Sequence, residues 1–550
     1  MSKRHRSPDG DEPMKRIHTD DGPSQVSPRS GFDGLFYDEL ILVIFSHLSW
    51  SDLCRVQPTN RNWCRLSLDN QLWKALYLNE YGRSRLRGVR GFIGRGDGRE
   101  IRPLPGRART EDVRDWKWMF RISSNWRTGR CSIENFSTIP AGVGRHDAWD
   151  HVLPDVDSSR RHTNIILAGG VIITTSPLAT TSPEVLLMSS GNPSVALPCP
   201  LVRTNDSIAT VTSLALDQSQ PSVHEHQHVR LVSLLSSGDF HLYSVNHLTP
   251  SSSHRLGTYT PSMTINLARV TPIIQSVYHH PLLVTLSQSF HLSLYDLTDP
   301  THITHCQTLT SYTSYPPTSL VLSTVSPTTY KLVLSYAIPV YPAHWSVGAT
   351  ELIMRNDRGP FIGHHPTPTI TVANSRSTKA FDIPAGWVDE QKMQAVKEQW
   401  SRKVSRVADT QTDGKWVILA PGDPFSSTRH MSTSLQLYRL HLPATATSFA
   451  TPRMTFVRTL HGHLGPVSSL SVADGRCVSL GVDGSIWVWD LEAGTGAEVT
   501  SIHDEHEEEG LQADLHLGYG LLGKKGAVVF DERRIVTADA RGLEVRRFDI

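Results

Sequence analysis

The sequence has few cysteines and no long apolar run. Its six cysteines lie far apart and form no C-x-x-C pair. We therefore expect no disulfides and infer a reducing compartment. No stretch approaches the ~20 apolar residues that cross a bilayer, and no apolar segment follows the charged start. The sequence thus predicts a soluble intracellular protein of the cytoplasm and/or nucleus, with no membrane partner.

An excess of one charge and the common catalytic motifs are also missing. With 54 basic and 53 acidic residues, the formal net charge is +1, which gives no reason to expect nucleic acid as a general partner. The chain contains no G-x-x-x-x-G-K-[ST], H-E-x-x-H or G-x-S-x-G motif. We predict that the protein is not an enzyme and that it needs no cofactor and no metal.

The composition instead favours a large body built from short strands. A chain of 550 residues is too long for one compact core, and its 34 prolines and 38 glycines indicate many turns. One small module followed by one large repeat domain fits these features, with β-structure favoured in the larger part.

The segment FYDELILVIFSHL, which follows residue 35, predicts a helix with two apolar faces. Leu40, Ile44 and Leu48 lie on one face, and Ile41 and Phe45 lie on a neighbouring one. Two further short helices are predicted from SWSDLCRV and from the segment that ends in LWKAL. Since so few residues bury little apolar surface among themselves, a partner is expected to cover part of this module.

This segment resembles the F-box. ELILVIFSHL, DLCRVQPTNRNW and DNQLWKAL carry nearly every anchor of that family in order, while Phe36-Tyr37 stands where Leu-Pro is usual. The resemblance implies binding to a Skp-type adaptor and, through it, to a cullin. The residues that it assigns to the adaptor-binding surface are Leu40, Ile41, Ile44, Phe45, Leu48, Leu53, Trp63, Leu72 and Trp73.

Residues 460–494 resemble one complete WD repeat, the unit of a β-propeller. They contain Gly462-His463, alternating strands, two Asp-Gly turns and a final Trp-Asp pair. In that family a His, a Ser or Thr, an Asp and a Trp form a buried hydrogen-bonded tetrad within the blade. The matching residues are His463, Ser479, Asp483 and Trp489. We interpret this set as structural and not as catalytic.

Weaker strand–turn–strand copies recur before and after this unit, for example in residues 228–246 and 276–299. About seven segments of the chain resemble the end of the third strand of a blade. Their number predicts a mainly β fold with about seven blades, although six or eight remain open. The final strand, GLEVRRFDI, has no following strand to pair with. We therefore predict that residues 130–136 pair with residues 542–550 and close the ring.

Four other segments have two interpretations each. Residues 388–407 predict a helix with one stripe of Met393, Val396, Trp400 and Val404, which either packs on the propeller or forms a lid beside a target site. The His224, His226 and His228 series is interpreted as an exposed loop, with a metal site as the alternative. The acidic run 504–509 is interpreted as a solvated loop, with binding of a basic partner as the alternative. Residues 81–112, rich in Arg and Gly, are interpreted as a flexible linker, with an RNA-binding arm as the alternative.

These predictions combine into one domain order and one function. The order is a disordered tail (1–30), an F-box (31–80), an Arg/Gly-rich linker (81–112), a helix with an Asn-Trp junction (113–129) and a β-propeller (130–550). The resemblance implies the substrate-receptor subunit of an SCF-type ubiquitin ligase, with a protein target on the propeller. The alternatives are an adaptor-bound scaffold without ubiquitin transfer and an RNA-associated propeller.

Overall fold

The structure is a computed structural model that describes residues 35–90, 115–136, 164–501 and 526–550. Within these ranges it leaves out 177, 191, 202–207, 220–226, 262–270, 341–342, 359–367, 382–385, 387–388, 423–433, 443–450, 474 and 540–541. The described chain forms two compact units, with the boundary between Leu76 and Tyr77. The predicted tail, the acidic run and residues 91–112 of the predicted linker lie outside the described residues.

The first unit is helical. Its helices are α2 (Asp38–Phe45), α3 (Trp50–Val56), α4 (Arg61–Ser67) and the start of α5 (Asn70–Arg90). Side-chain caps set two of the starts, because Ser49 accepts from the backbone N–H of Asp52 and Asn60 accepts from that of Trp63. The sequence prediction of a small helical module is confirmed. However, α5 continues to Arg90, so the first ten residues of the predicted linker are helical.

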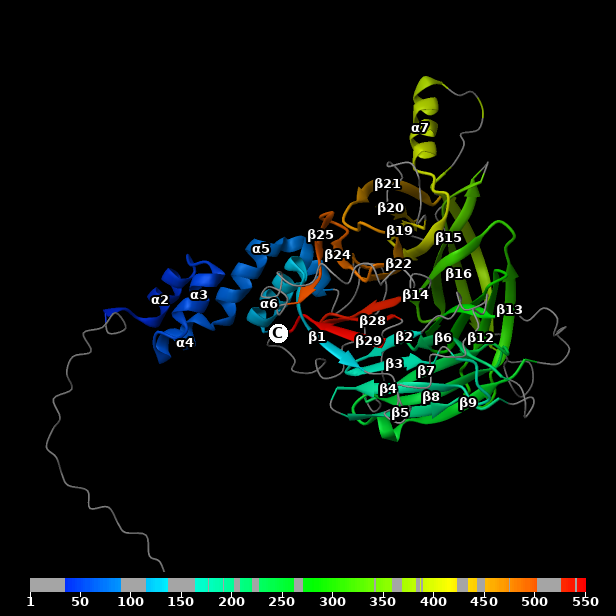
Figure 1. The fold of residues 1–550 in the computed structure, drawn as a ribbon, viewed down its shortest axis with the longest axis horizontal. Coiled ribbons are helices and arrows are strands. Elements are labelled where there is room, and N and C mark those ends of the chain that lie inside the picture. Colours follow the sequence, from blue (N-terminus) through cyan, green and yellow to red (C-terminus); the bar gives the residue numbers. More distant parts are fainter. Residues whose placement is uncertain are drawn as a thin grey trace, which may run out of the picture. The chain divides into compact units, whose positions relative to one another are not determined.

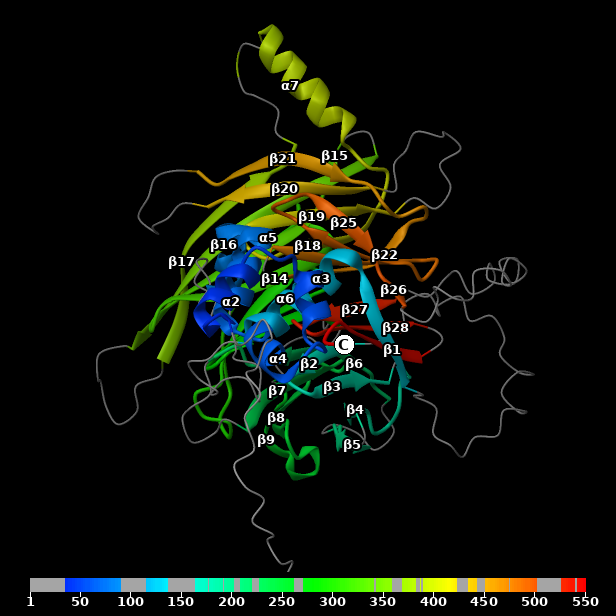
Figure 2. The ribbon, with the colours of Figure 1, turned by 90° about the vertical axis from the view of Figure 1, so that its left-hand side faces the viewer.

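The second unit is built from four-stranded antiparallel sheets arranged around a common axis (Figures 1 and 2). In the described part of the chain, the first three sheets, or blades, contain these strands and one short 3-10 helix: β2 (Ile165–Ala168), β3 (Val171–Thr175), β4 (Glu184–Ser189), β5 (Asn192–Pro198); β6 (Val211–Leu216), β7 (His228–Leu235), β8 (Phe240–Asn246), η2 (Pro250–Ser252), β9 (His254–Tyr259); β10 (Ile273–His279), β11 (Leu282–Ser287), β12 (His291–Asp296) and β13 (Thr304–Thr310).

Blades 4 to 6 follow in the same order, and the strands of blade 4 are the longest. Their strands are β14 (Tyr315–Ser326), β15 (Thr329–Val340), β16 (His344–Arg358), β17 (Pro368–Lys379); β18 (Val407–Thr412), β19 (Trp416–Pro421), β20 (Leu435–His441), β21 (Arg453–Leu460); β22 (Val467–Ala473), β23 (Arg476–Gly481), β24 (Ile486–Asp490) and β25 (Thr495–Glu498). The predicted seven-bladed propeller is confirmed by these sheets together with the last one.

Blade 7 joins the two ends of the domain. It contains β27 (Ala527–Phe530), β28 (Arg534–Asp539), β29 (Gly542–Arg547) and β1 (Arg130–Phe136). Strand β1 pairs antiparallel with β29, from Ser132 opposite Arg547 to Phe136 opposite Leu543. It also pairs in parallel with β26 (Thr500–Ser501). The predicted closure of the ring is therefore confirmed, and β1 covers the edge of β29 that would otherwise be open.

Apolar side chains fill the spaces between neighbouring blades. Among the described residues, seven buried clusters each span two adjacent sheets, and the last of them joins blade 7 to blade 1. In that cluster Val536 and Val545 of blade 7 pack with Ile172 of blade 1. Because every blade depends on both neighbours for its core, closure of blade 7 stabilises the whole ring.

Helix α6 (Trp116–Thr128) leads into β1. The Asn-Trp junction predicted from the sequence does not interrupt this helix, which continues through Asn125 and Trp126. It ends at Gly129, whose φ of 75° is left-handed, the conformation that glycine adopts at least cost. A side chain at Gly129 would also clash with the backbone of Glu498. The turn from α6 into β1 therefore requires glycine.

Helix α7 (Glu390–Ser401) projects from the ring between blades 4 and 5 (Figures 1 and 2). None of its residues is buried, and Met393 and Trp400 are exposed. The prediction that its stripe packs on the propeller is wrong. Val404 alone is buried there, because the segment after the helix forms an antiparallel bridge with Trp345. No helix in the described ranges is long and apolar enough to span a membrane.

Candidate adaptor-binding surface and propeller faces

The helical unit divides its apolar residues between a core and an exposed surface. Of the nine residues predicted to bind an adaptor, Leu40 and Ile44 are 49% and 41% exposed, and Leu48 and Trp63 are partly buried. The other five form the core of the unit and are corrected to structural residues, because their side chains are too buried to reach a partner: Ile41, Phe45, Leu53, Leu72 and Trp73.

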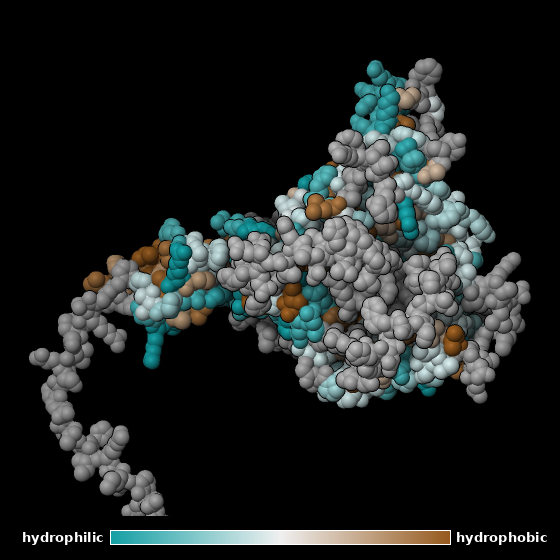
Figure 3. Space-filling model, in the orientation of Figure 1, coloured by the Kyte–Doolittle hydropathy of each residue, from teal (hydrophilic) through white to brown (hydrophobic). Residues whose placement is uncertain are grey.

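Sequence reasoning missed part of the exposed surface. Leu35, Tyr37 and Val43 are 77%, 80% and 57% exposed, and together with Leu40 and Ile44 they place large apolar side chains in solvent along α2 and its start. Figure 3 shows such side chains on the surface of the helical unit. We call these five residues the α2 surface. The signal for Val43 was its spacing of three residues from Leu40 on one helix face.

Polar contacts hold α2 against α4. Arg65 forms an ion pair with Asp38 and lowers the pKa of that carboxyl, with a smaller contribution from Asn62. Phe45 and Trp63 meet edge to face at 5.6 Å. These contacts fix the orientation of α2 and keep its outer face available to a partner.

In blade 6 the predicted tetrad forms a hydrogen-bonded network. The indole N–H of Trp489 donates to Ser479 Oγ at 2.8 Å, and His463 Nε2 lies 2.6 Å from the same oxygen. Asp483 joins through Ser485, whose Oγ donates to Asp483 Oδ1 at 2.7 Å and lies 3.0 Å from His463 Nδ1. Burial lowers the pKa of His463 to about 4, so the ring is neutral near pH 7. The network satisfies the buried polar atoms of His463, Ser479 and Trp489, whereas Asp483 is exposed.

A divergent form of this network occurs in blade 2 and escaped sequence reasoning. Tyr243 stands opposite Leu231, in the same register as Trp489 opposite Cys477. Its hydroxyl donates to Cys199 Sγ at 3.2 Å, and that sulfur lies 3.2 Å from Ser233 Oγ. The signal that identifies this network is a spacing of ten residues. A Ser or Thr on the second strand of the blade precedes an aromatic residue on the third strand by that number.

Other blades place different polar residues at the same position. In blade 3 Tyr295 occupies the position, and burial raises its pKa to about 12. In blade 7 an arginine occupies the position, and Arg546 Nη1 donates to Thr537 Oγ1 at 3.3 Å. In blade 4 the residue is Glu351, which forms an ion pair with a lysine of the neighbouring strand. Among the described strands, the tetrad position is therefore polar in most blades, and the family's residues occur in blade 6.

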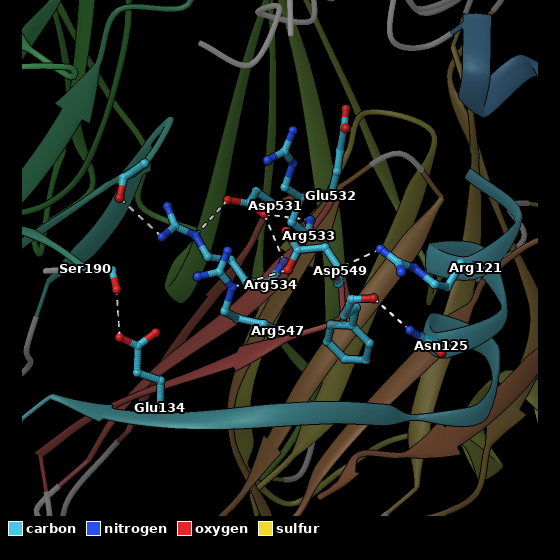
Figure 4. A network of polar contacts seen from close by, with 12 residues as sticks. Arg121, Asn125, Glu134, Ser190, Asp531, Glu532, Arg533, Arg534, Arg547 and Asp549 are labelled. Atoms are coloured by element: carbon cyan, nitrogen blue, oxygen red, sulfur yellow. Dashed lines mark hydrogen bonds and ion pairs between the residues drawn. The ribbon is translucent and has the colours of Figure 1, made fainter. Parts of the chain in front are cut away.

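The junction between α6 and blade 7 is a second polar network (Figure 4). The Asn125 side chain donates to the carbonyl of Phe548 at 2.8 Å, and Trp126 Nε1 donates to the carbonyl of Glu532 at 2.9 Å. The Trp126 ring stacks on Phe548 at 4.1 Å, and Phe548 is fully buried. Across β1, the hydroxyl of Ser190 in blade 1 donates to a carboxylate oxygen of Glu134 at 2.9 Å.

These contacts define two faces of the ring. The α6 face is formed by the turns that join strands one and two and strands three and four of each blade. Helix α6 lies on this face, since Trp126 contacts Arg476 and Trp118 contacts Arg533, both beside such turns. The opposite face is formed by the turns between strands two and three and by the connections between blades, including α7.

A cavity of about 310 Å³ lies in the central channel. It is lined by residues from the inner strands of all seven blades, among them Ser213, Ser276, Ser319 and Gln411. Ser213 and Ser276 hydrogen-bond to each other at 2.8 Å, and no charged residue occurs among the described residues that line the cavity. The lining supplies hydroxyl and amide groups.

The histidine series has no metal-binding geometry in the described chain. His224 and His226 lie outside the described residues, and His228 Nδ1 lies 3.0 Å from Ser244 Oγ. No group of three His, Cys, Asp or Glu side chains with metal-binding geometry occurs among the residues that the structure describes. The six cysteines are all free thiols.

A helical F-box unit and a closed seven-bladed ring on one chain define the class: an F-box protein whose body is a β-propeller. Residues 190–516 match the family described as F-box protein pof12 beta-propeller, and residues 38–79 match the F-box-like domain. Since the first match spans more than half of the chain, the protein belongs to this family. No curated protein matches it. This architecture is typical of non-catalytic adaptor and receptor proteins.

Several solved structures are similar to this chain at low identity. The computationally designed Ika8 protein is 12% identical over 70% of this chain and 82% of its own, with a TM-score of 0.33. The WD40 beta propeller domain of Doa1 is 12% identical over 68% and 88%, also with a TM-score of 0.33. Saccharomyces cerevisiae Sqt1 is 7% identical over 69% and 92%, with a TM-score of 0.35. The seven-bladed fold is established by the strand pairing described above.

Proposed function

We propose that this protein is the substrate receptor of an SCF-type ubiquitin ligase. The observation that carries the proposal is the α2 surface, an exposed apolar strip on a folded F-box attached to a closed propeller. F-box domains generally bind Skp1-type adaptors, and the adaptor would bridge to a cullin. Large apolar side chains in solvent mark surfaces that another protein covers.

The receptor would act by positioning. Binding the ligase through one domain and the target through another raises the effective concentration of target lysines near the ubiquitin-conjugating enzyme. The chain makes no bond in this scheme. A closed ring supports this role because its loops are held by a rigid body and present a constant surface to the target.

The test is co-purification of a Skp-type adaptor with the full chain and with the Leu40→Asp/Ile44→Asp double variant. Both side chains are exposed, so the helical core stays intact, while a charge at each position opposes burial against the adaptor. We expect the double variant to lose at least tenfold in adaptor recovery, as for apolar anchors of interfaces. Val325→Asp, at an exposed apolar residue of the propeller, is the control and should bind normally.

Undiminished adaptor recovery by the double variant would refute the proposal. Cullin recovery and target accumulation during proteasome inhibition separate a ligase receptor from a scaffold. Adaptor binding without cullin would leave the scaffold as the function and would also contradict the proposal.

A further inference from the structure

Exposed apolar side chains of the propeller gather on the face opposite α6. Among the described residues, two large exposed apolar side chains lie in loops or strand ends of the α6 face, Leu248 and Val325. The opposite face carries these seven: Leu178, Ile208, Tyr312, Tyr315, Met393, Trp400 and Leu464. Exposed apolar side chains that are scattered singly are normal on a protein surface, so a binding site is expected where several of them lie together, as at blade 4.

The aromatic members of this set are connected at blade 4. Tyr315 meets Trp345 edge to face at 5.5 Å, and its hydroxyl donates to the carbonyl of Tyr312 at 3.4 Å. Trp345 exchanges two backbone hydrogen bonds with Val404, in the segment that leaves α7. Tyr312 is 87% exposed although it is large and apolar. The hairpin β15–β16 and the α7 connection thus hold these rings on one surface.

The end of α7 continues this surface. Trp400 contacts Phe381 at 5.7 Å, and Lys403 Nζ lies 3.9 Å from the centre of the Trp400 ring. The backbone carbonyl of Arg402 accepts from Gln436 of blade 5 at 2.8 Å, which anchors the end of the helix to the ring. We call Tyr312, Tyr315, Trp345, Trp400 and Lys403 the blade-4 patch.

The side of the blade-4 patch that adjoins the end of α7 is basic. The segment that leaves α7 carries Arg402, Lys403 and Arg406, and no acidic residue lies between Glu398 and Asp409 in the sequence. Arg406 is exposed. Glu398, on α7, is the nearest preceding carboxylate in the sequence. Apolar and aromatic side chains with a basic border are complementary to a ligand with apolar side chains and flanking negative charge.

We propose that the blade-4 patch binds a segment of the target protein that carries large apolar side chains flanked by carboxylates. This inference rests on the proposed function, because it names the chemistry of the target. A protein ligand fits better than a single-stranded nucleic acid, which uses open aromatic faces as stacking platforms. Here the Tyr315 and Trp345 rings meet at 79°, so they form no common platform, and aliphatic side chains such as Leu464 share the face.

The patch is tested with peptides selected from a random displayed library on the full-length chain. We expect the selected peptides to combine Leu, Phe or Trp with Asp or Glu. Their affinity, measured by fluorescence anisotropy, should fall at least tenfold in Tyr312→Ala/Trp400→Ala, as for aromatic anchors of interfaces. Lys403→Glu/Arg406→Glu should weaken binding by a similar factor, and added salt should weaken binding to the wild type.

Leu248→Ala/Val325→Ala, on the α6 face, is the matched control and should bind the peptides as the wild type does. Equal melting temperatures of all variants establish that the propeller is folded. Peptides without carboxylates, no selected peptides, or affinities unchanged in the patch variants would overturn the proposal. Binding of an oligouridine that is lost in the same variants would assign the patch to nucleic acid instead.

Adaptor recovery measured on the same variants separates this inference from the proposed function. The patch variants should retain the adaptor, since their substitutions lie in the propeller. Peptide binding that depends on the patch, in a chain that never recovers an adaptor, would refute the ligase assignment alone. Normal adaptor recovery with patch-independent peptide binding would refute this inference alone.

Discussion

At the scale of single residues, polar groups are buried in this propeller where the third strand of a blade faces the second. Blade 6 uses Trp489 and Ser479 at this place, whereas blade 2 uses Tyr243 and Ser233. Each arrangement gives the buried hydroxyl a partner, which removes the cost of burying it alone. Blades 6 and 2 therefore share a satisfied hydrogen bond at this place and not a residue type.

The neutral His463 ring makes stability depend on pH. Burial lowers its pKa from 6.5 to about 4, so the unfolded chain binds a proton more readily than the folded one between these values. The free energy of unfolding then falls as the pH drops from about 6.5 to about 4. From about pH 7.5 to 5.5, we expect this one group to remove about 1 kcal/mol of stability.

Melting temperatures of the wild type and of His463→Gln at the two pH values test this. The variant should be less stable at about pH 7.5, because it loses the contact to Ser479, and it should lose less stability on acidification. His302→Gln, at an exposed histidine, is the control and should follow the wild type. Parallel pH profiles of the wild type and His463→Gln would contradict the prediction.

At the scale of elements, β1 and α6 together close the ring at blade 7. Strand β1 pairs with β29, while Trp126 on α6 stacks on Phe548 just beyond that strand. Trp126 also contacts Phe530 of β27 at 5.9 Å. Helix α5 covers the other side of α6, where Tyr81 meets Phe120 at 5.5 Å. The pairing of β1 therefore stabilises blade 7 at its edge, and the packing of α6 stabilises the same blade at the ends of its strands.

Two truncations separate these contributions. We expect removal of residues 1–136 to destabilise the whole propeller, because it deletes β1 and α6 and exposes the edge of β29. Removal of residues 1–112 keeps both elements and should leave cooperative unfolding, with a smaller loss from the missing Tyr81 contact. Replacing Trp126 alone by alanine should lower the free energy of unfolding by ~3–5 kcal/mol, as for other buried aromatic residues.

Thermal unfolding of the two truncated chains, followed by near-UV circular dichroism, provides the measurement. A clearly lower and broader transition for the shorter chain is the expected result. Equal melting temperatures would mean that β1 adds nothing to the ring, in conflict with its pairing in the structure.

At the scale of the whole molecule, the sequence predicted features that depend on strand counting and local pattern. The need for one more strand after β29 pointed to residues 130–136, and the Gly-His and Trp-Asp pairs identified blade 6. It did not separate the core of the F-box from its surface, because α2 is apolar on two sides and Ile41 and Ile44 look alike in a sequence. Which of these two residues is buried depends on how α2 packs against α4. The sequence pattern of α2 alone does not show that packing.

The position of α7 shows a second limit of sequence reasoning. An apolar stripe indicates that one face of a helix is buried against another surface. It does not indicate whether that surface belongs to the same chain. Met393 and Trp400 were expected to pack on the propeller, and the structure leaves both exposed. Similarly, Gly129 and not Asn125-Trp126 ends α6, because the left-handed turn required there is a property of the backbone.

Closure by β1 also sets an order of events during synthesis. Phe136 and its partner Leu543 are separated by roughly 400 residues, which a ribosome adds in roughly 20–80 s at ~5–20 residues per second. The F-box helices have left the ribosome long before the ring has its last strand. In stalled nascent chains we expect adaptor binding to precede protease resistance of the propeller. Under the proposed function, a newly made chain would then be attached to an adaptor before its propeller has a finished surface for any target.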